Sequence, residues 1–161
     1  MTAVAGFSPM RRLFPQVMDN DYRGLKAGLW VFAALVFLRG GIGLNCVFNG
    51  AYVASHADGI PMDSFTPAAA RIIATDFATW GLMQVMLCLI AILALARYRA
   101  MVPLMVAIFL LEHASRKLIL YTMPIVKTGD APGSYVNLAI FGLEVAGLIL
   151  ALWPRGGRAR S

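Results

Sequence analysis

The stretch LKAGLWVFAALVFLRGGIGLNCVFNGAY, residues 25–52, decides the fold class of this chain. Beyond Lys26, its only charged residue is Arg39, which lies near the middle. A helix needs about 20 mostly apolar residues to cross the roughly 30 Å hydrocarbon core of a bilayer. The stretch therefore predicts a membrane-spanning helix that carries one cation at mid-membrane depth.

Three further apolar stretches follow, over about 67–96, 102–121 and 135–153. Thr66 before Pro67 suits a helix N-cap with proline in the first turn, and Ser134 after Pro132-Gly133 suits the same role. The four stretches together predict an all-α, polytopic membrane protein, a four-transmembrane-helix bundle over residues 25–153. Residues 1–24 are predicted to form a cytoplasmic or interfacial tail, and residues 154–161 a basic cytoplasmic tail.

The bulk composition agrees with a membrane protein. Hydrophobic residues make up 60% of the 161 residues and charged residues 14%, whereas soluble domains are about 45–50% apolar and about 25% charged. The net charge of +6 does not indicate nucleic-acid binding, because the basic residues form no recognition helix or aromatic-basic pattern. Cys46 and Cys88 lie in separate apolar stretches without a partner motif, so neither a zinc site nor a disulfide framework is expected.

The distribution of Lys and Arg predicts the orientation. Basic residues gather in both tails and in the link between the second and third stretches, whereas the other two links carry only Lys127. Because basic residues near helix ends mark the cytoplasmic side, both termini are predicted to be cytoplasmic. The residues on that side are Arg11, Arg12, Arg23, Lys26, Arg97, Arg99, Arg155, Arg158 and Arg160.

Polar and ionisable residues interrupt the apolar stretches. A charge at the bilayer centre costs at least about 2.5–3.5 kcal/mol, and such side chains face the bundle interior and pair with one another. With a rise of about 1.5 Å per residue, they fall in the middle and outer half of the bundle. They predict one shared intramembrane polar network, formed by Arg39, Asp76, Glu112, Arg116, Glu144, His113, Gln84 and Asn45.

Helical spacing predicts the pairings within this network. Glu112 and Arg116 are four residues apart and are expected to share the inward helix face. His113 and Lys117 point about 100° away, so Lys117 is expected to reach the outer interface with His113 beneath it. Arg39 is expected to approach Asp76 or Glu144, and Arg116 to bridge Glu112 and Glu144. Two arginines then face three carboxylates, which leaves one acid in excess, to be protonated or paired with Arg71.

Scattered residues resemble a known family. Ala70-Arg71 at the start of the second stretch is followed by Asp76 and Gly81, with Arg116 late in the third stretch and Glu144 in the fourth. This pattern resembles small four-helix inner-membrane proteins of bacteria, of unknown function and loosely DoxX-like. The resemblance implies a multi-pass protein of the bacterial inner membrane. Some DoxX relatives are linked to quinone or thiol redox chemistry, but Cys46 and Cys88 lack a supporting motif, so no redox role is carried over.

Several functions stay open at this stage. The network either fixes helix register or binds a small amphipathic molecule, a lipid or a partner protein. A subunit of a proton-coupled transporter, working as a homodimer, is the alternative, with Glu112 or Glu144 as the proton carrier. An intramembrane enzyme acting on a quinone or lipid, with Glu112 or His113 as general base, ranks last because no nucleophile or nucleotide motif is present. No cofactor is expected: haem needs two facing histidines, and a di-metal bundle needs paired Glu-x-x-His motifs.

Overall fold

The computed structural model describes residues 9–128 and 131–154, and this part of the chain contains helices and no strand. Four long helices carry the fold: α2 (Lys26–Tyr52), α3 (Pro67–Arg97), α4 (Val102–Thr122) and α5 (Pro132–Leu152). Short elements join them, namely α1 (Pro9–Leu13), the π-helical turn η1 (Val53–Ala57), and the 3₁₀ turns η2 (Met62–Ser64) and η3 (Arg99–Met101).

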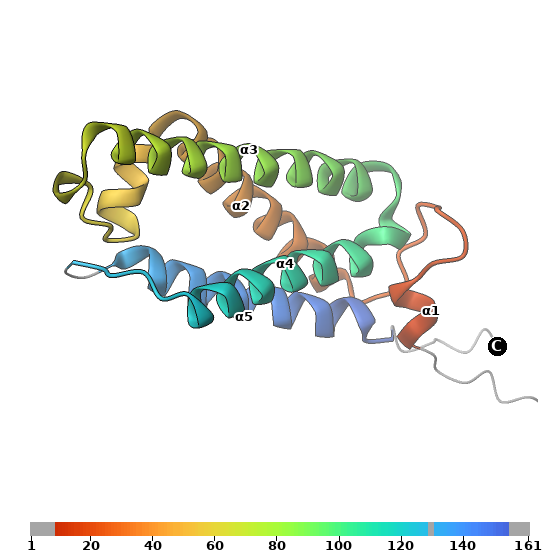
Figure 1. Cartoon of the computed structure of the whole chain (residues 1–161). Coiled ribbons are helices and arrows are strands. Elements are labelled where there is room, and N and C mark those ends of the chain that lie inside the picture. The colour runs from red at the N-terminus through yellow and green to blue at the C-terminus, as the bar shows by residue number, and fades with distance from the viewer. Residues whose placement is uncertain (1–8, 129–130, 155–161) are drawn as a thin grey trace, which may run out of the picture.

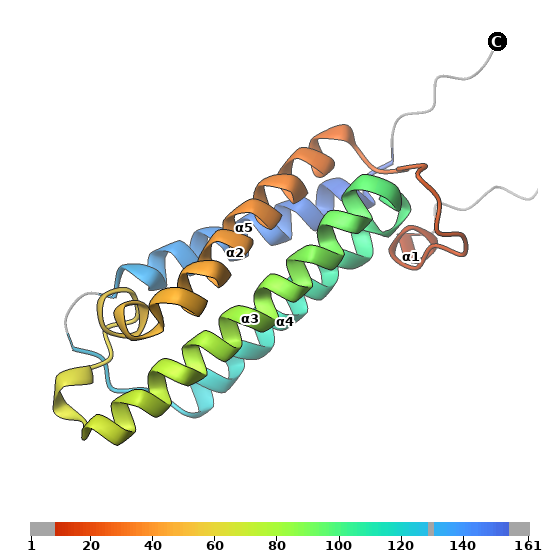
Figure 2. The same ribbon diagram turned by 90° about the horizontal axis from the view of Figure 1, so that it is seen from above.

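The long helices run roughly along one axis (Figures 1 and 2). We call the end that holds α1, η3 and the last turn of α5 the proximal end, and the end that holds η1, η2 and the link from α4 to α5 the distal end. α2 packs against α3 and α5, and α5 packs against α4, whereas α3 and α4 make few contacts. The space between α3 and α4 is therefore where the helices are least tightly closed.

Three of these segments are long and apolar enough to span a membrane: Lys26–Ala57, Pro67–Arg97 and Pro132–Leu152. α4 is as long as α5 but carries Glu112, Arg116 and Lys117 in its second half, and it is not among the three. Large apolar side chains cover the outer surfaces of the helices; Trp30, Phe37 and Phe48 are each about 80% exposed. A contiguous apolar surface of this extent is typical of a lipid-facing protein.

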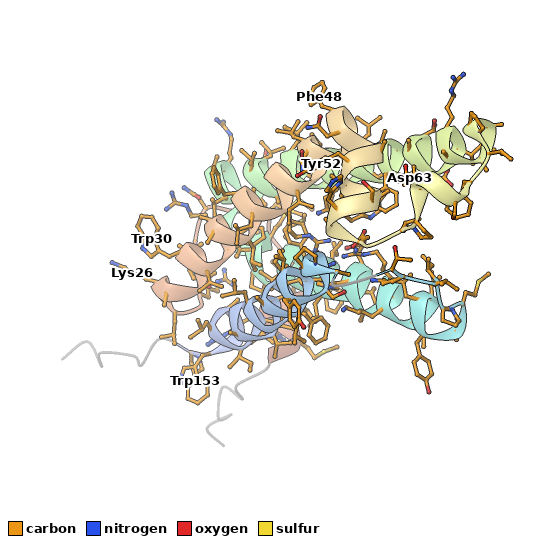
Figure 3. The ribbon with its side chains drawn as sticks, turned by 90° about the vertical axis from the view of Figure 1, so that its left-hand side faces the viewer. Lys26, Trp30, Phe48, Tyr52, Asp63 and Trp153 are labelled. Carbon is orange, nitrogen blue, oxygen red and sulfur yellow. The ribbon has the colours of Figure 1, made fainter. Side chains whose placement is uncertain are left out.

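Aromatic residues mark both ends of the helices. Trp30 and Trp153 lie toward the proximal end together with Lys26, and Phe48 and Tyr52 lie toward the distal end, near Asp63 (Figure 3). Tryptophan and tyrosine favour the membrane–water interface because their rings are apolar and their tips are polar. Their placement is the one expected if the helix axis lies across a bilayer.

Small residues bring α2 and α3 close together. A methyl group added to Gly81 would lie 2.5 Å from the carbonyl oxygen of Gly43, and one added to Gly50 would lie 2.5 Å from that of Ala74. Small side chains at such crossings let helix backbones approach closely, which maximises van der Waals contact where lipid supplies no hydrophobic driving force. This contact fixes the rotation of α2 against α3.

The proximal half of the bundle has an apolar core. Phe32 and Leu35 from α2, and Val106 and Phe109 from α4, are fully buried in it. Phe32 and Phe109 pack with ring centroids 5.8 Å apart. This half is therefore closed by ordinary packing, and the buried polar side chains lie further along the helices.

The segment before α2 folds onto the proximal end. Arg12 donates a hydrogen bond to the carbonyl oxygen of Leu152 at 3.1 Å, and the backbone N–H of Ala100 donates to Asp19 at 3.2 Å. Tyr22 is buried. The predicted tail over 1–24 is thus packed against the bundle from α1 onward, whereas residues 1–8, and 155–161 of the second tail, lie outside the described residues.

The helix ends follow local chemistry. Thr66 caps α3 as predicted, since its side-chain oxygen accepts from the N–H of Ala69 at 3.3 Å. The prediction for Ser134 is wrong: α5 begins at Pro132, with Ala131 as the N-cap residue. Proline fits the first helical turn because its missing N–H has no partner there in any helix, so the helix starts earlier than the apolar pattern alone indicates.

Candidate functional site: a buried ion cluster beneath a distal cavity

Arg39 lies at the centre of a polar cluster halfway along the bundle. One guanidinium nitrogen, Nη1, donates to Glu144 Oε1 at 2.7 Å and to the carbonyl oxygen of Phe109 at 3.1 Å. The other, Nη2, donates to Gln84 Oε1 at 3.0 Å and to a carboxylate oxygen of Glu112. Arg39 is only 4% exposed, so these four acceptors, which come from three other helices, replace its hydration.

His113 and Glu144 form a second part of the cluster. His113 Nδ1 lies 3.0 Å from Glu144 Oε2, and both side chains are buried. Glu144 Oε1 also accepts from Arg39; because a carboxylate oxygen accepts, the His113 tautomer that fits this contact carries its hydrogen on Nδ1. The opposite nitrogen, Nε2, is buried and has no hydrogen-bond partner among the described residues.

Arg116 connects the cluster to the distal end. Its Nε lies 3.6 Å from Glu112 Oε1, which is ion-pair distance but too long for a hydrogen bond. The guanidinium carbon lies 4.8 Å from the centre of the Trp80 ring, a cation–π contact. Nε has no hydrogen-bond partner in the described part of the chain, so its N–H can still donate a hydrogen bond to a ligand or a water molecule.

A cavity of about 270 Å³ opens at the distal end, in the space between α3 and α4. Asp76, Phe77 and Trp80 from α3 form one wall, and Arg116, Lys117 and Leu120 from α4 form the other. The remaining lining residues are Asp58, Ile60, Ile125, Lys127, Ser134 and Asn137.

Two loops meet beside this cavity. Gly59 has a φ of +70°, a conformation that glycine adopts without steric cost, and its carbonyl oxygen accepts from the backbone N–H of Thr128 at 2.8 Å. Asp58 and Ile60 flank Gly59, and Ile125 and Lys127 precede Thr128. This hydrogen bond joins the loop after α2 to the loop after α4 and keeps residues of both loops at the cavity.

A second, much smaller hollow of about 10 Å³ lies deeper. It shares Trp80, Arg116 and Asn137 with the large cavity, and it is also lined by Arg39, Gln84 and His113. This volume holds about one water molecule. The hollow therefore shares lining residues with both the cavity and the ion cluster.

Six of the predicted network residues lie together in the structure: Arg39, Gln84, Glu112, His113, Arg116 and Glu144. Asn45 does not join them; its side chain accepts from Asn49 on the exposed surface of α2. Asp76 also lies apart, exposed at the cavity wall. Because Asp76 lies outside the cluster, Arg39 and Arg116 face two glutamates there. The cluster therefore contains no carboxylate in excess, although the sequence predicted one.

Two predicted arrangements around α4 are wrong. The inward face carries His113 and not Glu112 and Arg116, and Arg116 pairs with Glu112 without bridging to Glu144. The buried stripe of α4 runs through Val102, Met105, Val106, Phe109 and His113. Because this stripe faces α2 and α5, it carries His113 inward and leaves Glu112 and Arg116 on its flank, about 30% exposed.

Asn137 was not singled out from the sequence. It lies two turns before Glu144 on α5 and lines both the large cavity and the small hollow. Residues seven apart share a helix face, so its spacing from Glu144 was the available signal.

Asp58 supplies a pH-dependent prediction. Burial raises the pKa of its carboxyl above the ordinary value, an effect that Lys127 and Arg116 only partly offset. Because the folded-state pKa is the higher one, ionisation of Asp58 destabilises the fold; the cost is full above the folded pKa and absent below the unfolded value of about 3.9. Asp58→Asn should therefore have a modestly higher melting temperature in detergent at pH 7, and the gain should vanish as the pH falls to about 4.

The matched control is Asp63→Asn, at an exposed position on η2, which should not change the melting temperature at either pH. A stabilisation by Asp58→Asn that persists unchanged at about pH 4 would show that charge is not its cause.

The described residues include no group of three or more His, Cys, Asp or Glu side chains arranged to hold a metal ion. Cys46 and Cys88 are buried and unpaired with each other. The cluster can therefore donate and accept hydrogen bonds, hold a proton and bind a charged group, through its own side chains.

The fold and the site together define a class: an all-helical protein with helices that can span a membrane and with ionisable side chains buried between them. Comparison with family models, curated proteins and solved structures finds no match.

Proposed function

We propose that this protein is an inner-membrane protein of bacteria whose distal cavity binds a small amphipathic molecule with an anionic head group. In this proposal α4 is a fourth transmembrane helix beside α2, α3 and α5, both termini are cytoplasmic, and the cavity opens toward the periplasmic side. Membership in the DoxX-like family, which scattered residues of the sequence resemble, stays a prediction.

The charges of α4 support its place in the membrane. Glu112 pairs with Arg39 and Arg116, and His113 pairs with Glu144. Paired charges that face a bundle interior are the form in which ionisable residues occur within bilayers. The basic residues Lys26, Arg97 and Arg99 lie at the proximal end, which fits a cytoplasmic position.

The cavity lining is the observation that carries the proposed ligand class. Three cations, Arg116, Lys117 and Lys127, line the cavity against two carboxylates, Asp58 and Asp76. Arg116, the cation in excess among the lining residues, also pairs with Glu112 behind the wall. Phe77, Leu120 and Ile125 add apolar surface beside these charges. A wall that is basic on one part and apolar on another suits an anionic head with a short hydrocarbon tail.

Octanoate is a suitable probe because it combines a carboxylate with a short alkyl chain. Added to the purified protein in nanodiscs, it should raise the melting temperature, whereas octanol at equal concentration should raise it less. Arg116→Gln should weaken octanoate binding about 10–100-fold, the loss expected for a charge-assisted hydrogen bond of about 1.5–3 kcal/mol.

Lys26→Gln is the matched control, because it removes a cation at the proximal end, away from the cavity, and should leave octanoate binding unchanged. Lys127→Gln, in the loop after α4, tests the same cavity without altering any helix. If octanoate and octanol stabilise all these proteins equally, the cavity does not select an anion and the proposed function fails.

A further inference from the structure

We propose that anion binding in the distal cavity is coupled to the uptake of one proton by His113. The inference rests on the proposed function and adds to it the chemistry that follows binding: the ligand brings a negative charge to Arg116, and His113 Nε2 gains a proton in response.

His113 has one ring nitrogen, Nε2, that makes no hydrogen bond within the described part of the chain. The side chain is 1% exposed, and its Nδ1–H is committed to Glu144, while Nε2 has no partner among the described residues. An unpaired buried polar atom is costly, so a water molecule beside Nε2 is favourable: it can donate to the bare nitrogen or accept from a protonated one. The small hollow lined by His113 and Arg116 gives such a water molecule a place.

Charges on every neighbouring helix act on His113. Arg39 lies on α2, Gln84 on α3, Glu112 and Arg116 on α4, and Glu144 on α5; Asp76 faces the large cavity. Arg39 and Arg116 oppose a further positive charge, while Glu112 and Glu144 favour it. The formal charges of these four groups sum to zero, as do those of Lys117 and Asp76 at the cavity wall.

An anion held by Arg116 changes this balance by one unit. Arg116 lines both the cavity and the hollow that His113 also lines, so the added negative charge lies close to the buried imidazole. The low local polarity strengthens the interaction between the two. Protonation restores the sum to zero: one proton from solvent forms an N–H bond at Nε2, the Nδ1–H stays with Glu144, and no other bond changes.

The chain offers a direct spectroscopic test. It contains two histidines, and His56 lies in η1, stacked on Tyr52 and outside the cavity lining. In His56→Gln protein with ¹⁵N-labelled histidine, every imidazole signal therefore belongs to His113. At pH 7.5, octanoate should move the Nε2 signal from the position of an unprotonated nitrogen to that of a protonated one, and octanol should not.

Binding affinity supplies the second readout. If one proton is taken up with each anion, reciprocity requires octanoate affinity to rise about tenfold per unit decrease in pH. His113→Gln should remove most of this slope, and His56→Gln should keep it. The signal measured on His113 itself keeps the proposal testable if His113→Gln does not fold.

The outcomes separate the two proposals. Octanoate that binds with pH-independent affinity and leaves the His113 signal unchanged overturns the coupling and leaves the anion site standing. Proton uptake without a change at His113 assigns the proton to another group and also overturns it. Octanoate that does not bind at all removes the proposed function, and the coupling with it.

Discussion

Replacing Arg39 with leucine should lower the free energy of unfolding by about 3–5 kcal/mol, the range found when one partner of a buried ion pair is removed. Arg39 holds Glu144 and Glu112 at once and also bonds Gln84. Leucine cannot replace the guanidinium, so Glu144 is left without a cation and Glu112 keeps only Arg116. The loss can be measured by unfolding the purified protein in mixed micelles with increasing SDS.

Two controls make this result specific. Arg71→Leu removes an exposed arginine from the first turns of α3 and should change stability little. The triple variant Arg39→Leu, Glu112→Gln, Glu144→Gln should recover part of the loss, because no carboxylate of the cluster is left without a cation; the recovery is incomplete because Arg116 loses Glu112. If Arg39→Leu and Arg71→Leu are equally stable, the carboxylates are not held by Arg39 and the cluster described above is incorrect.

Gly81→Leu should also destabilise the protein strongly, by about 1–3 kcal/mol or more, as expected for overpacking at a tight contact. Even a single added carbon would lie 2.5 Å from the carbonyl oxygen of Gly43 and 2.7 Å from Cys46 Cβ. Backbone atoms cannot move aside as a flexible side chain can, so α3 has to shift away from α2. SDS unfolding of the variant measures the effect.

Gly41→Leu is the matched control on α2, because a Cβ atom added there meets no atom of another helix within 4 Å. It should cause no loss of stability. Gly81→Leu should in addition weaken octanoate binding, because Trp80 and Phe77 on α3 line the cavity and move with the helix. Equal stability of the two variants would mean that α2 and α3 do not meet at Gly43 and Gly81.

Much of the architecture could be predicted from the sequence. α2, α3 and α4 begin and end within one residue of the predicted stretches 25–52, 67–96 and 102–121, since long apolar runs and boundary residues such as Thr66-Pro67 are local signals. The ionisable residues that form the cluster were likewise visible, because a charge inside an apolar run is costly and therefore conspicuous.

The sequence did not show which of these ionisable residues are buried in the cluster and which stay exposed. Asp76 and Glu144 are both acids within apolar stretches, yet Glu144 is fully buried against Arg39 while Asp76 lies exposed at the cavity wall. Asn45 and Gln84 differ in the same way. Spacing along a helix shows which residues share a face, but not which face turns inward.

The sequence by itself determined that this protein is built of long apolar helices carrying charges at mid-length. Only the tertiary structure decided that His113 joins Glu144, that Arg116 extends over Trp80 toward a cavity, and that Asp76 and Asn45 stay apart. The physical reason is that lipid-facing helices are apolar on nearly every side, so hydrophobic periodicity cannot set their rotation. Their rotation is set by close contacts between helices, such as that of Gly43 with Gly81, which link residues far apart in the chain.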